Sequence, residues 1–110
     1  MMQETIAKIE ARLAAAEQLP EEKRAELLGL LRQLKEEVQV LSQTHAEDAR
    51  SITQFAALSA HEATREEIKP PLLETSLSGL ARSVEGFESS HPKLVDIVNR
   101  ICTTLSNLGI

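Results

Sequence analysis

Apolar residues recur at alternating intervals of four and three along most of this chain, and this spacing constrains its fold more than any other feature. The clearest run is LLGLLRQLKEEVQVL, residues 27–41, where a leucine or valine returns on every helical turn. Such a repeat places the apolar side chains on one stripe of an α-helix and the charged ones opposite. The residues of these seams are Met2, Ile6, Ile9, Leu13 and Ala16; Leu27, Leu31, Leu34, Val38 and Leu41; Leu73, Leu77, Leu80, Val84 and Phe87; and Leu94, Ile97, Val98, Ile101, Leu105 and Leu108. The sequence therefore predicts an all-α fold with heptad-like packing, as a bundle or a coiled-coil oligomer.

Prolines mark the corners between these helices. Pro20 and Pro92 can each sit at the first helical position, where the missing N–H has no partner to lose. Lys69 stands before Pro70, and a residue before proline is driven out of the α region, so a helix should end there. Predicted helices run over about residues 3–18, 20–42, 46–68, 72–89 and 92–108.

The apolar seam fails in the middle of the chain, where His45 and Asp48 occupy positions expected to be apolar. Thr44-x-x-Glu47 has the form of a capping box, which would start a new helix. One interpretation is a single helix over about residues 20–68, which would be ~70 Å long and suit a dimeric coiled coil. The other is a break near residues 42–44, which we favour slightly.

Residues 46–68 carry mostly small side chains on their apolar face: Ala49, Ile52, Ala56, Ala60 and Ala63. Such a face allows another helix to approach closely, but each alanine buries little surface. The apolar pattern of this segment is therefore weaker than that of the leucine-rich seams. The segment is also a candidate for lying in, or forming, a groove with a helix of another protein.

With 110 residues the chain is expected to be one helical domain, residues 1–110. Its parts are an N-terminal helical hairpin (1–42), a variable middle helix (43–69) and a C-terminal helical hairpin (70–110). Phe55 and Phe87 are the only aromatic residues of the phenylalanine, tyrosine and tryptophan class. A chain this small buries only about 65% of its unfolded surface when it folds alone, so oligomerisation would help it.

Charge and cysteine content argue against several classes of function. The formal net charge is -5 at pH 7 and no basic tract is present, so nucleic-acid binding is not expected. No apolar run reaches the ~20 residues of a membrane span, and the N-terminus lacks the layout of a secretory signal. Cys102 is the single cysteine, so no intrachain disulfide can form. A cytoplasmic location is therefore predicted.

The histidines and the cysteine fit structural roles better than chemical ones. His61-Glu62-x-x-Arg65 begins like a zinc-protease helix, but an arginine stands where the second histidine ligand is needed. His45, His61 and His91 lie in separate segments without metal-ligand spacing. The predicted role of His91 is to cap the helix that begins at Pro92, and Cys102 is expected to be a buried, inert thiol.

We therefore predict no catalytic, cofactor-binding or metal-binding residues, no cofactor and no small-molecule substrate. The protein is not expected to be an enzyme, because no nucleophile, general base or phosphate-binding loop is assembled in the sequence.

The last segment carries a distinctive set of residues. Phe87-Glu88-x-x-His91-Pro92-x-Leu94 is followed at the end of the chain by Leu105-Ser106-Asn107-Leu108-Gly109-Ile110. This pair of motifs resembles a family of short bacterial proteins of unknown function, over the last ~25 residues. The resemblance implies a helical fold and a bacterial, cytosolic source, and it implies no activity. Physically, Gly109 suits a helix C-cap and Ile110 the apolar contact that accompanies it.

The function expected from these observations is that of an uncharacterised, self-associating helical scaffold or adaptor. Its partner would be a second copy, giving a homodimer. The alternative is a partner-binding module, such as a small chaperone or regulator, that uses the alanine-faced middle helix.

Overall fold

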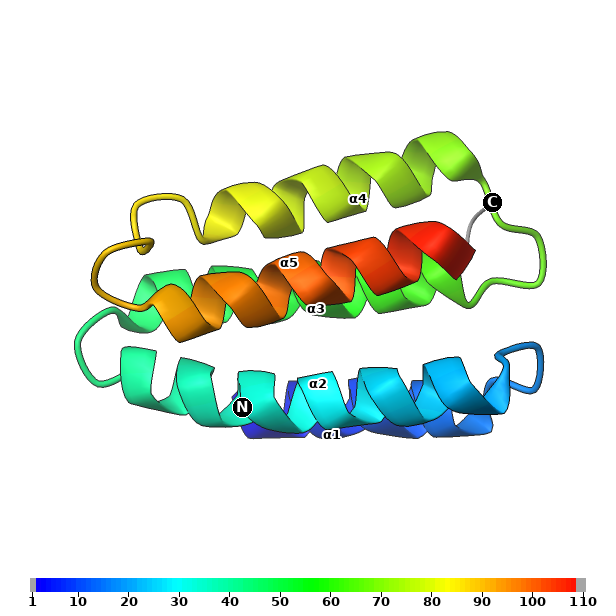
Figure 1. The fold of residues 1–110 in the computed structure, drawn as a ribbon, viewed down its shortest axis with the longest axis horizontal. Helices are drawn as coiled ribbons and strands as arrows, with labels where there is room; N and C mark the ends of the chain where they lie inside the picture. The colour runs from blue at the N-terminus through cyan, green and yellow to red at the C-terminus, as the bar shows by residue number, and fades with distance from the viewer. Residues whose placement is uncertain (1, 109–110) are drawn as a thin grey trace.

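A computed structural model describes residues 2–108, where the chain forms five α-helices and no strand. They are α1 (Met2–Ala15), α2 (Glu21–Leu41), α3 (Ala46–Ala63), α4 (Pro70–Ser83) and α5 (Pro92–Leu108). Successive helices run antiparallel and are joined by short turns (Figure 1). The all-α prediction is confirmed. A turn separates α2 from α3, so the break near residues 42–44 is correct and the single helix over residues 20–68 is wrong.

Several helices are shorter than the sequence suggested. Two end beside a hydroxyl that bonds a carbonyl of the last turn: Thr64 Oγ1 donates to the Ala60 carbonyl at 2.7 Å, and Ser83 Oγ donates to the Leu80 carbonyl at 2.6 Å. These hydroxyls offer the backbone an alternative to further helix. The corrected ends are Ala15 instead of about 18 for α1, Ala63 instead of about 68 for α3, and Ser83 instead of about 89 for α4, which begins at Pro70 instead of about 72.

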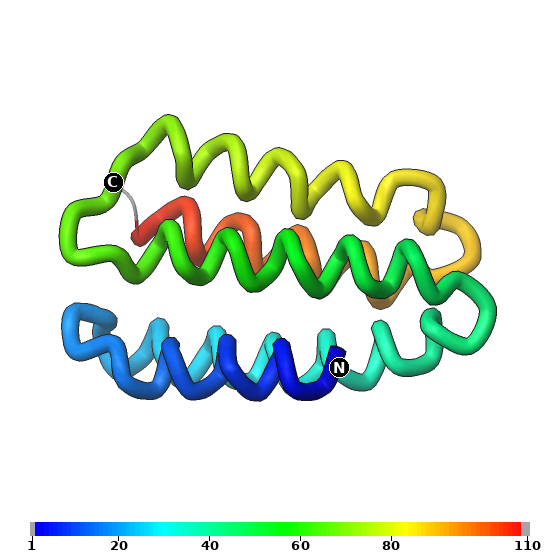
Figure 2. Tube along the Cα trace, turned by 180° about the vertical axis from the view of Figure 1, so that it is seen from behind, coloured from blue at the N-terminus to red at the C-terminus, as the bar shows by residue number. Residues whose placement is uncertain are grey.

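Helices α1, α2, α5 and α3 form a four-helix arrangement, and α4 lies over the seam between α3 and α5 (Figures 1 and 2). Helix α3 packs against all four others, whereas α4 packs only against α3 and α5. The middle helix has a weaker apolar pattern than the leucine-rich seams, yet it contacts every other helix. Its position makes it the helix around which the others assemble.

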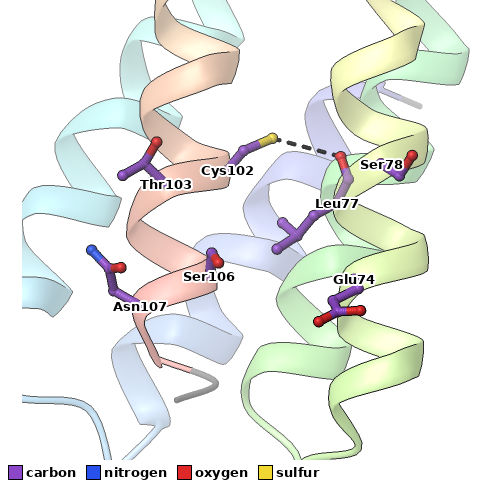
Figure 3. Close-up of a pocket in the computed structure, with 7 residues that line it drawn as sticks. All are labelled: Glu74, Leu77, Ser78, Cys102, Thr103, Ser106 and Asn107. Carbon is purple, nitrogen blue, oxygen red and sulfur yellow. Dashed lines mark hydrogen bonds between the residues drawn. The ribbon is translucent and has the colours of Figure 1, made fainter.

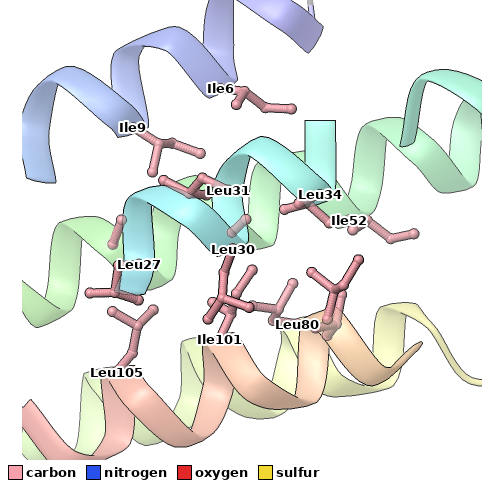
Figure 4. Packing of buried hydrophobic residues seen from close by; sticks show 14 of the residues in the cluster. Ile6, Ile9, Leu27, Leu30, Leu31, Leu34, Ile52, Leu80, Ile101 and Leu105 are labelled. Carbon is pink, nitrogen blue, oxygen red and sulfur yellow. The ribbon is translucent and has the colours of Figure 1, made fainter. Parts of the chain in front are cut away.

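One cluster of buried aliphatic side chains fills the centre (Figure 4). It includes members of all four predicted seams, such as Leu13, Leu34, Leu80 and Leu105, each at most 2% exposed. Met2, Phe87 and Leu108 are only partly buried against it, and Phe87 lies beyond α4 in the following turn instead of continuing the α4 seam. The apolar face of α3 is also part of the core: Ala49, Ile52, Ala56, Ala60 and Ala63 are all buried.

Burial of that alanine face corrects the proposed groove as well. The face is already covered by other helices of the same chain, so it is not free to receive a helix of another protein. Binding there would require α3 to leave the core.

Phe55 of α3 lies against Gly79 of α4. A Cβ atom added at Gly79 would lie against one edge of the Phe55 ring, closer to its carbons than real Cβ atoms come. Gly29 of α2 is a contrasting case. A Cβ there would meet nothing within 4 Å, so Gly29 is merely tolerated in α2.

Arg24 of α2 closes the carboxyl end of α1. Its Nη2 donates to the Ala16 carbonyl at 2.6 Å and to the Leu19 carbonyl at 3.3 Å, and its Nε donates to the Leu13 carbonyl at 3.4 Å. Nη1 also bonds the exposed Glu21 carboxylate at 3.1 Å. The guanidinium thus adds charge-assisted hydrogen bonds to carbonyls in the last turn of α1 and in the turn that follows it.

Candidate functional site

Three rings meet at one end of the bundle, where the α2–α3 and α4–α5 turns lie side by side. The centroid distances are 5.4 Å for His45 and Phe87, 5.6 Å for Phe87 and His91, and 6.4 Å for His45 and His91. The three ring planes are nearly perpendicular, with interplanar angles of 81° to 87°. Edge-to-face contacts of this kind are favourable for aromatic rings. We call these residues the ring cluster, and it is the candidate site that the structure offers.

Local backbone geometry positions the cluster. Gly86 has φ +95°, a conformation that side-chain-bearing residues rarely adopt, and its N–H donates to Glu88 Oε1 at 2.9 Å. The turn brings Phe87 back toward the bundle, and the His91 N–H then donates to the Phe87 carbonyl at 2.8 Å. His45 precedes α3 as its N-cap residue. The ring cluster therefore joins the two turns that start α3 and α5.

The hydrogen bonds at the starts of α3 and α5 differ from the predicted ones. His45 Nδ1 lies 2.8 Å from Thr44 Oγ1, and that hydroxyl also contacts the Leu41 carbonyl, so the predicted capping box with Glu47 is not formed. The bond recorded for the His91 ring is to Ser90 Oγ, 3.0 Å from Nδ1, and not to a helix N–H. The prediction that Pro92 begins a helix is correct.

His61 lies in a different place, near the carboxyl end of α3. Arg12 Nη1 donates to His61 Nδ1 at 3.4 Å. His45 and His91 thus lie close together, whereas His61 lies apart from both. Among residues 2–108, no group of three or more histidine, cysteine, aspartate or glutamate side chains is arranged to hold a metal ion.

Glu62, the next residue of the motif, is only 7% exposed. Arg65 Nη1 donates to its Oε1 at 3.0 Å, and His61 Nε2 lies 3.9 Å from its Oε2. An arginine in place of the second histidine of the zinc motif therefore has a structural role, since it neutralises a nearly buried carboxylate.

Cys102 lies beside an open groove of about 480 Å³ between α4 and α5 (Figure 3). Its Sγ contacts the Leu77 carbonyl at 3.7 Å, and the other lining residues are Glu74, Ser78, Thr103, Ser106 and Asn107. Burial raises the pKa of the Cys102 thiol to about 11. The thiol is therefore protonated near neutral pH and is a poor nucleophile there.

Three further motif residues of the C-terminal segment lie in or beside the core. Leu94 and Leu105 are buried, and Leu108 packs against the cluster while partly buried. Gly109 and Ile110 lie outside the described residues, so their predicted capping role stays a prediction.

These features define a small α-helical bundle whose distinctive residues serve mainly to shape its turns. Residues 2–108 contain no helix that is both long and apolar enough to cross a membrane.

The chain belongs to the family described as Domain of unknown function (DUF4404), which it matches over residues 2–110. The match extends through the N-terminal and middle segments, beyond the C-terminal motifs that carried the resemblance. No curated protein and no solved structure matches the chain.

Proposed function

We propose that this protein is a non-enzymatic helical protein that associates with copies of itself and acts as a scaffold or adaptor in the bacterial cytoplasm. The observation that carries the proposal is the exposure of large aliphatic side chains on outward helix faces. Val40, Leu58 and Leu72 are 56%, 45% and 46% exposed. Leu58 and Leu72 lie on helices that pack directly on each other.

The chemistry of the described residues supports a non-enzymatic role. Catalytic groups generally act together in a pocket that limits access of water. Here Cys102, His61 and the ring cluster lie in separate parts of the bundle. The groove beside Cys102 is open, and its thiol is protonated at neutral pH.

Small size also favours association. A chain of this length buries a modest fraction of its unfolded surface, and burial against a second copy adds to its stability by mass action. The C-terminal pair of motifs of this chain has a structural rather than chemical role in this proposal, because Phe87 and His91 contact His45 of the other turn while Leu94 and Leu105 fill the core.

Sedimentation equilibrium over a range of micromolar concentrations tests the proposal. The expected result is a mass that rises with concentration from the 12.1 kDa of the monomer toward twice that value. A mass that stays at the monomer value throughout this range would overturn it.

A further inference from the structure

His45 and His91 of the ring cluster are far apart in the sequence, and the fold brings their imidazoles together. The ring centroids lie 6.4 Å apart, and the ring planes are nearly perpendicular, at 81°. His45 precedes α3 and His91 precedes α5, so the two rings come from different turns of the bundle. Imidazole is the commonest protein ligand of transition-metal ions, and two imidazoles that lie this close are a potential chelating pair. Spacing along the chain hides the pair, because only the packing of the two turns creates it.

The hydrogen bonds of both rings leave the Nε2 atoms available. His45 Nδ1 lies 2.8 Å from Thr44 Oγ1, and that hydroxyl donates to the Leu41 carbonyl at 3.4 Å. Because a hydroxyl has one hydrogen, Thr44 Oγ1 accepts from the Nδ1–H of His45, and the free lone pair of the neutral ring is then on Nε2. His91 repeats this arrangement with its own preceding residue, since Ser90 Oγ lies 3.0 Å from its Nδ1. Within residues 2–108, neither Nε2 atom has a hydrogen-bond partner.

Metal-binding histidines use the same pattern of contacts. A histidine that coordinates a metal through one nitrogen usually donates its other N–H to a neighbouring acceptor, which fixes the tautomer and the ring orientation. Phe87 restrains the rings further, because its own ring packs edge-to-face with His45 at 5.4 Å and with His91 at 5.6 Å. Each imidazole is therefore held by a hydroxyl and by Phe87 in the absence of an ion.

We propose that His45 and His91 bind one divalent transition-metal ion of the kind that imidazole prefers, such as Zn²⁺, through their two Nε2 atoms. Two imidazoles on one tetrahedral ion have centroids roughly 5–5.5 Å apart when the metal–nitrogen bonds are about 2.0–2.1 Å. The observed separation is 6.4 Å, so a ring movement of about 1 Å closes the site. Water molecules complete the coordination shell. Metal binding at this place goes beyond the proposed self-association and does not depend on it.

Acidic side chains around the two turns favour a cation. Glu47 and Asp48 are exposed in the first turn of α3, and Glu85 and Glu88 are exposed in the turn before α5. Lys93, in the first turn of α5, is the one basic side chain in these two short stretches of sequence. The surplus of negative charge attracts a divalent ion and offsets the positive ends of the α3 and α5 helix dipoles.

Two protein ligands predict a moderate affinity. Structural zinc sites have four protein ligands and bind the ion very tightly. A site with two imidazoles is expected to have a dissociation constant of roughly 1–100 µM. The bound ion joins the α2–α3 turn to the α4–α5 turn, so it should stabilise the folded chain by mass action.

Isothermal titration calorimetry and thermal unfolding of the full chain, purified without a polyhistidine tag, test the site. ZnCl₂ should bind with one ion per chain and, at about 1 mM, should raise the melting temperature by at least about 5 °C. MgCl₂ at the same concentration should do neither, because Mg²⁺ prefers oxygen ligands. A chain that shows neither zinc binding nor a zinc-dependent rise in melting temperature would overturn the proposal.

Asparagine variants locate the ion. H45N and H91N remove an imidazole but keep a residue that suits the start of a helix. Each should raise the dissociation constant for Zn²⁺ more than about tenfold, since the loss of a second-shell partner alone costs about 10–100-fold. H61N is the matched control, because His61 lies near the other end of α3 and should not contribute. Circular dichroism checks that each variant folds. Unchanged affinity in H45N and H91N, or an equal loss in H61N, would overturn the assignment to this pair.

Histidine NMR spectra of the wild type give a second test that does not depend on the folding of a variant. The chain has three histidines, so three ring Cε1–H signals are expected, and the H61N spectrum identifies that of His61. Zn²⁺ should shift the signals of His45 and His91 over the same range of concentration and leave the His61 signal in place. A shift of one ring alone, or equal shifts of all three, would contradict an ion shared by His45 and His91.

Discussion

The α1–α2 pair and the α3–α4 pair are both antiparallel helix pairs, yet different side chains hold each together. In the first pair, leucines and isoleucines of two seams interlock, and Arg24 closes the corner. In the second, α3 presents alanines, and Phe55 lies against Gly79. Small side chains let the helix axes come close, so many short contacts replace a few large side chains. Core burial in this fold is thus reached in two ways, by side-chain size and by close approach.

The largest loss of stability is expected when a buried leucine of the α2 seam is truncated. Leu34 is 0% exposed in α2, and L34A should lower the free energy of unfolding by about 3 kcal/mol through lost burial and a residual cavity. Urea unfolding followed by circular dichroism measures the change. All variants are compared at one protein concentration, because self-association would make stability depend on concentration.

The matched control is L28A, which shortens a half-buried leucine on the same helix. L28A should lower the free energy of unfolding clearly less than L34A does, since truncating a half-buried leucine removes less buried apolar surface. Equal losses for the two variants would mean that the α2 seam is not what stabilises the first pair.

Arg24 is the next target, because it is 19% exposed and bonds three carbonyls at the end of α1. R24A should cost about 2 kcal/mol, as expected for hydrogen bonds that involve a charged group. R24K should recover little of the loss, because an ammonium lacks the fork that reaches several carbonyls at once. The same urea unfolding experiment measures both variants.

Arg100 provides the comparison for that variant. It pairs with Asp96 on the surface of α5 and is 67% exposed. R100A should change stability by no more than about 0.5 kcal/mol. A loss as large as that of R24A would show that removal of any ion-paired arginine is costly, and would contradict a capping role for Arg24.

The leucine seams and the turns at prolines could be predicted from the sequence, because each depends only on residues that are close together in the chain. A spacing of three and four defines a helix face whatever that face meets, and a proline restricts its own neighbours. The α5 helix was predicted with correct bounds for this reason, since Pro92 starts it and the seam runs unbroken to Leu108.

The central position of α3 could not be predicted from the sequence, because the spacing of its alanines does not show which helices cover them. The Arg24 cap was missed for a similar reason: the guanidinium bonds carbonyls of another helix, and no residue type marks an accepting carbonyl. The ring cluster had one sequence signal, the polar His45 at an apolar position of the seam. Its partners Phe87 and His91 are some forty residues away, and only the packing of two turns brings them together.

The substitution G79A tests whether close approach of α3 and α4 stabilises that pair. G79A adds a Cβ that collides with the Phe55 ring, so the ring must move. The collision should outweigh the ~1 kcal/mol that alanine gains over glycine in a helix, for a net loss of about 1 kcal/mol. Urea unfolding at fixed protein concentration measures this loss.

A double-mutant cycle assigns the loss to that one contact. F55A removes the ring, so G79A should stabilise the F55A protein instead of destabilising it. If G79A costs the same with and without the ring, the loss comes from elsewhere and the close approach of α3 and α4 does not depend on this pair.

The substitution G29A should give the smallest effect, and it tests the contrast between the α1–α2 and α3–α4 pairs most directly. It lies in the middle of α2, in the leucine-rich pair, and a Cβ there would meet no atom within 4 Å. G29A should therefore raise the free energy of unfolding, by up to about 1 kcal/mol, through helix propensity alone. The same substitution thus has opposite signs in the two pairs, because one glycine is a helix-weakening residue and the other makes room for a neighbouring ring. Loss of stability in G29A would mean that α1 and α2 also rely on close approach, and the contrast between the pairs would not hold.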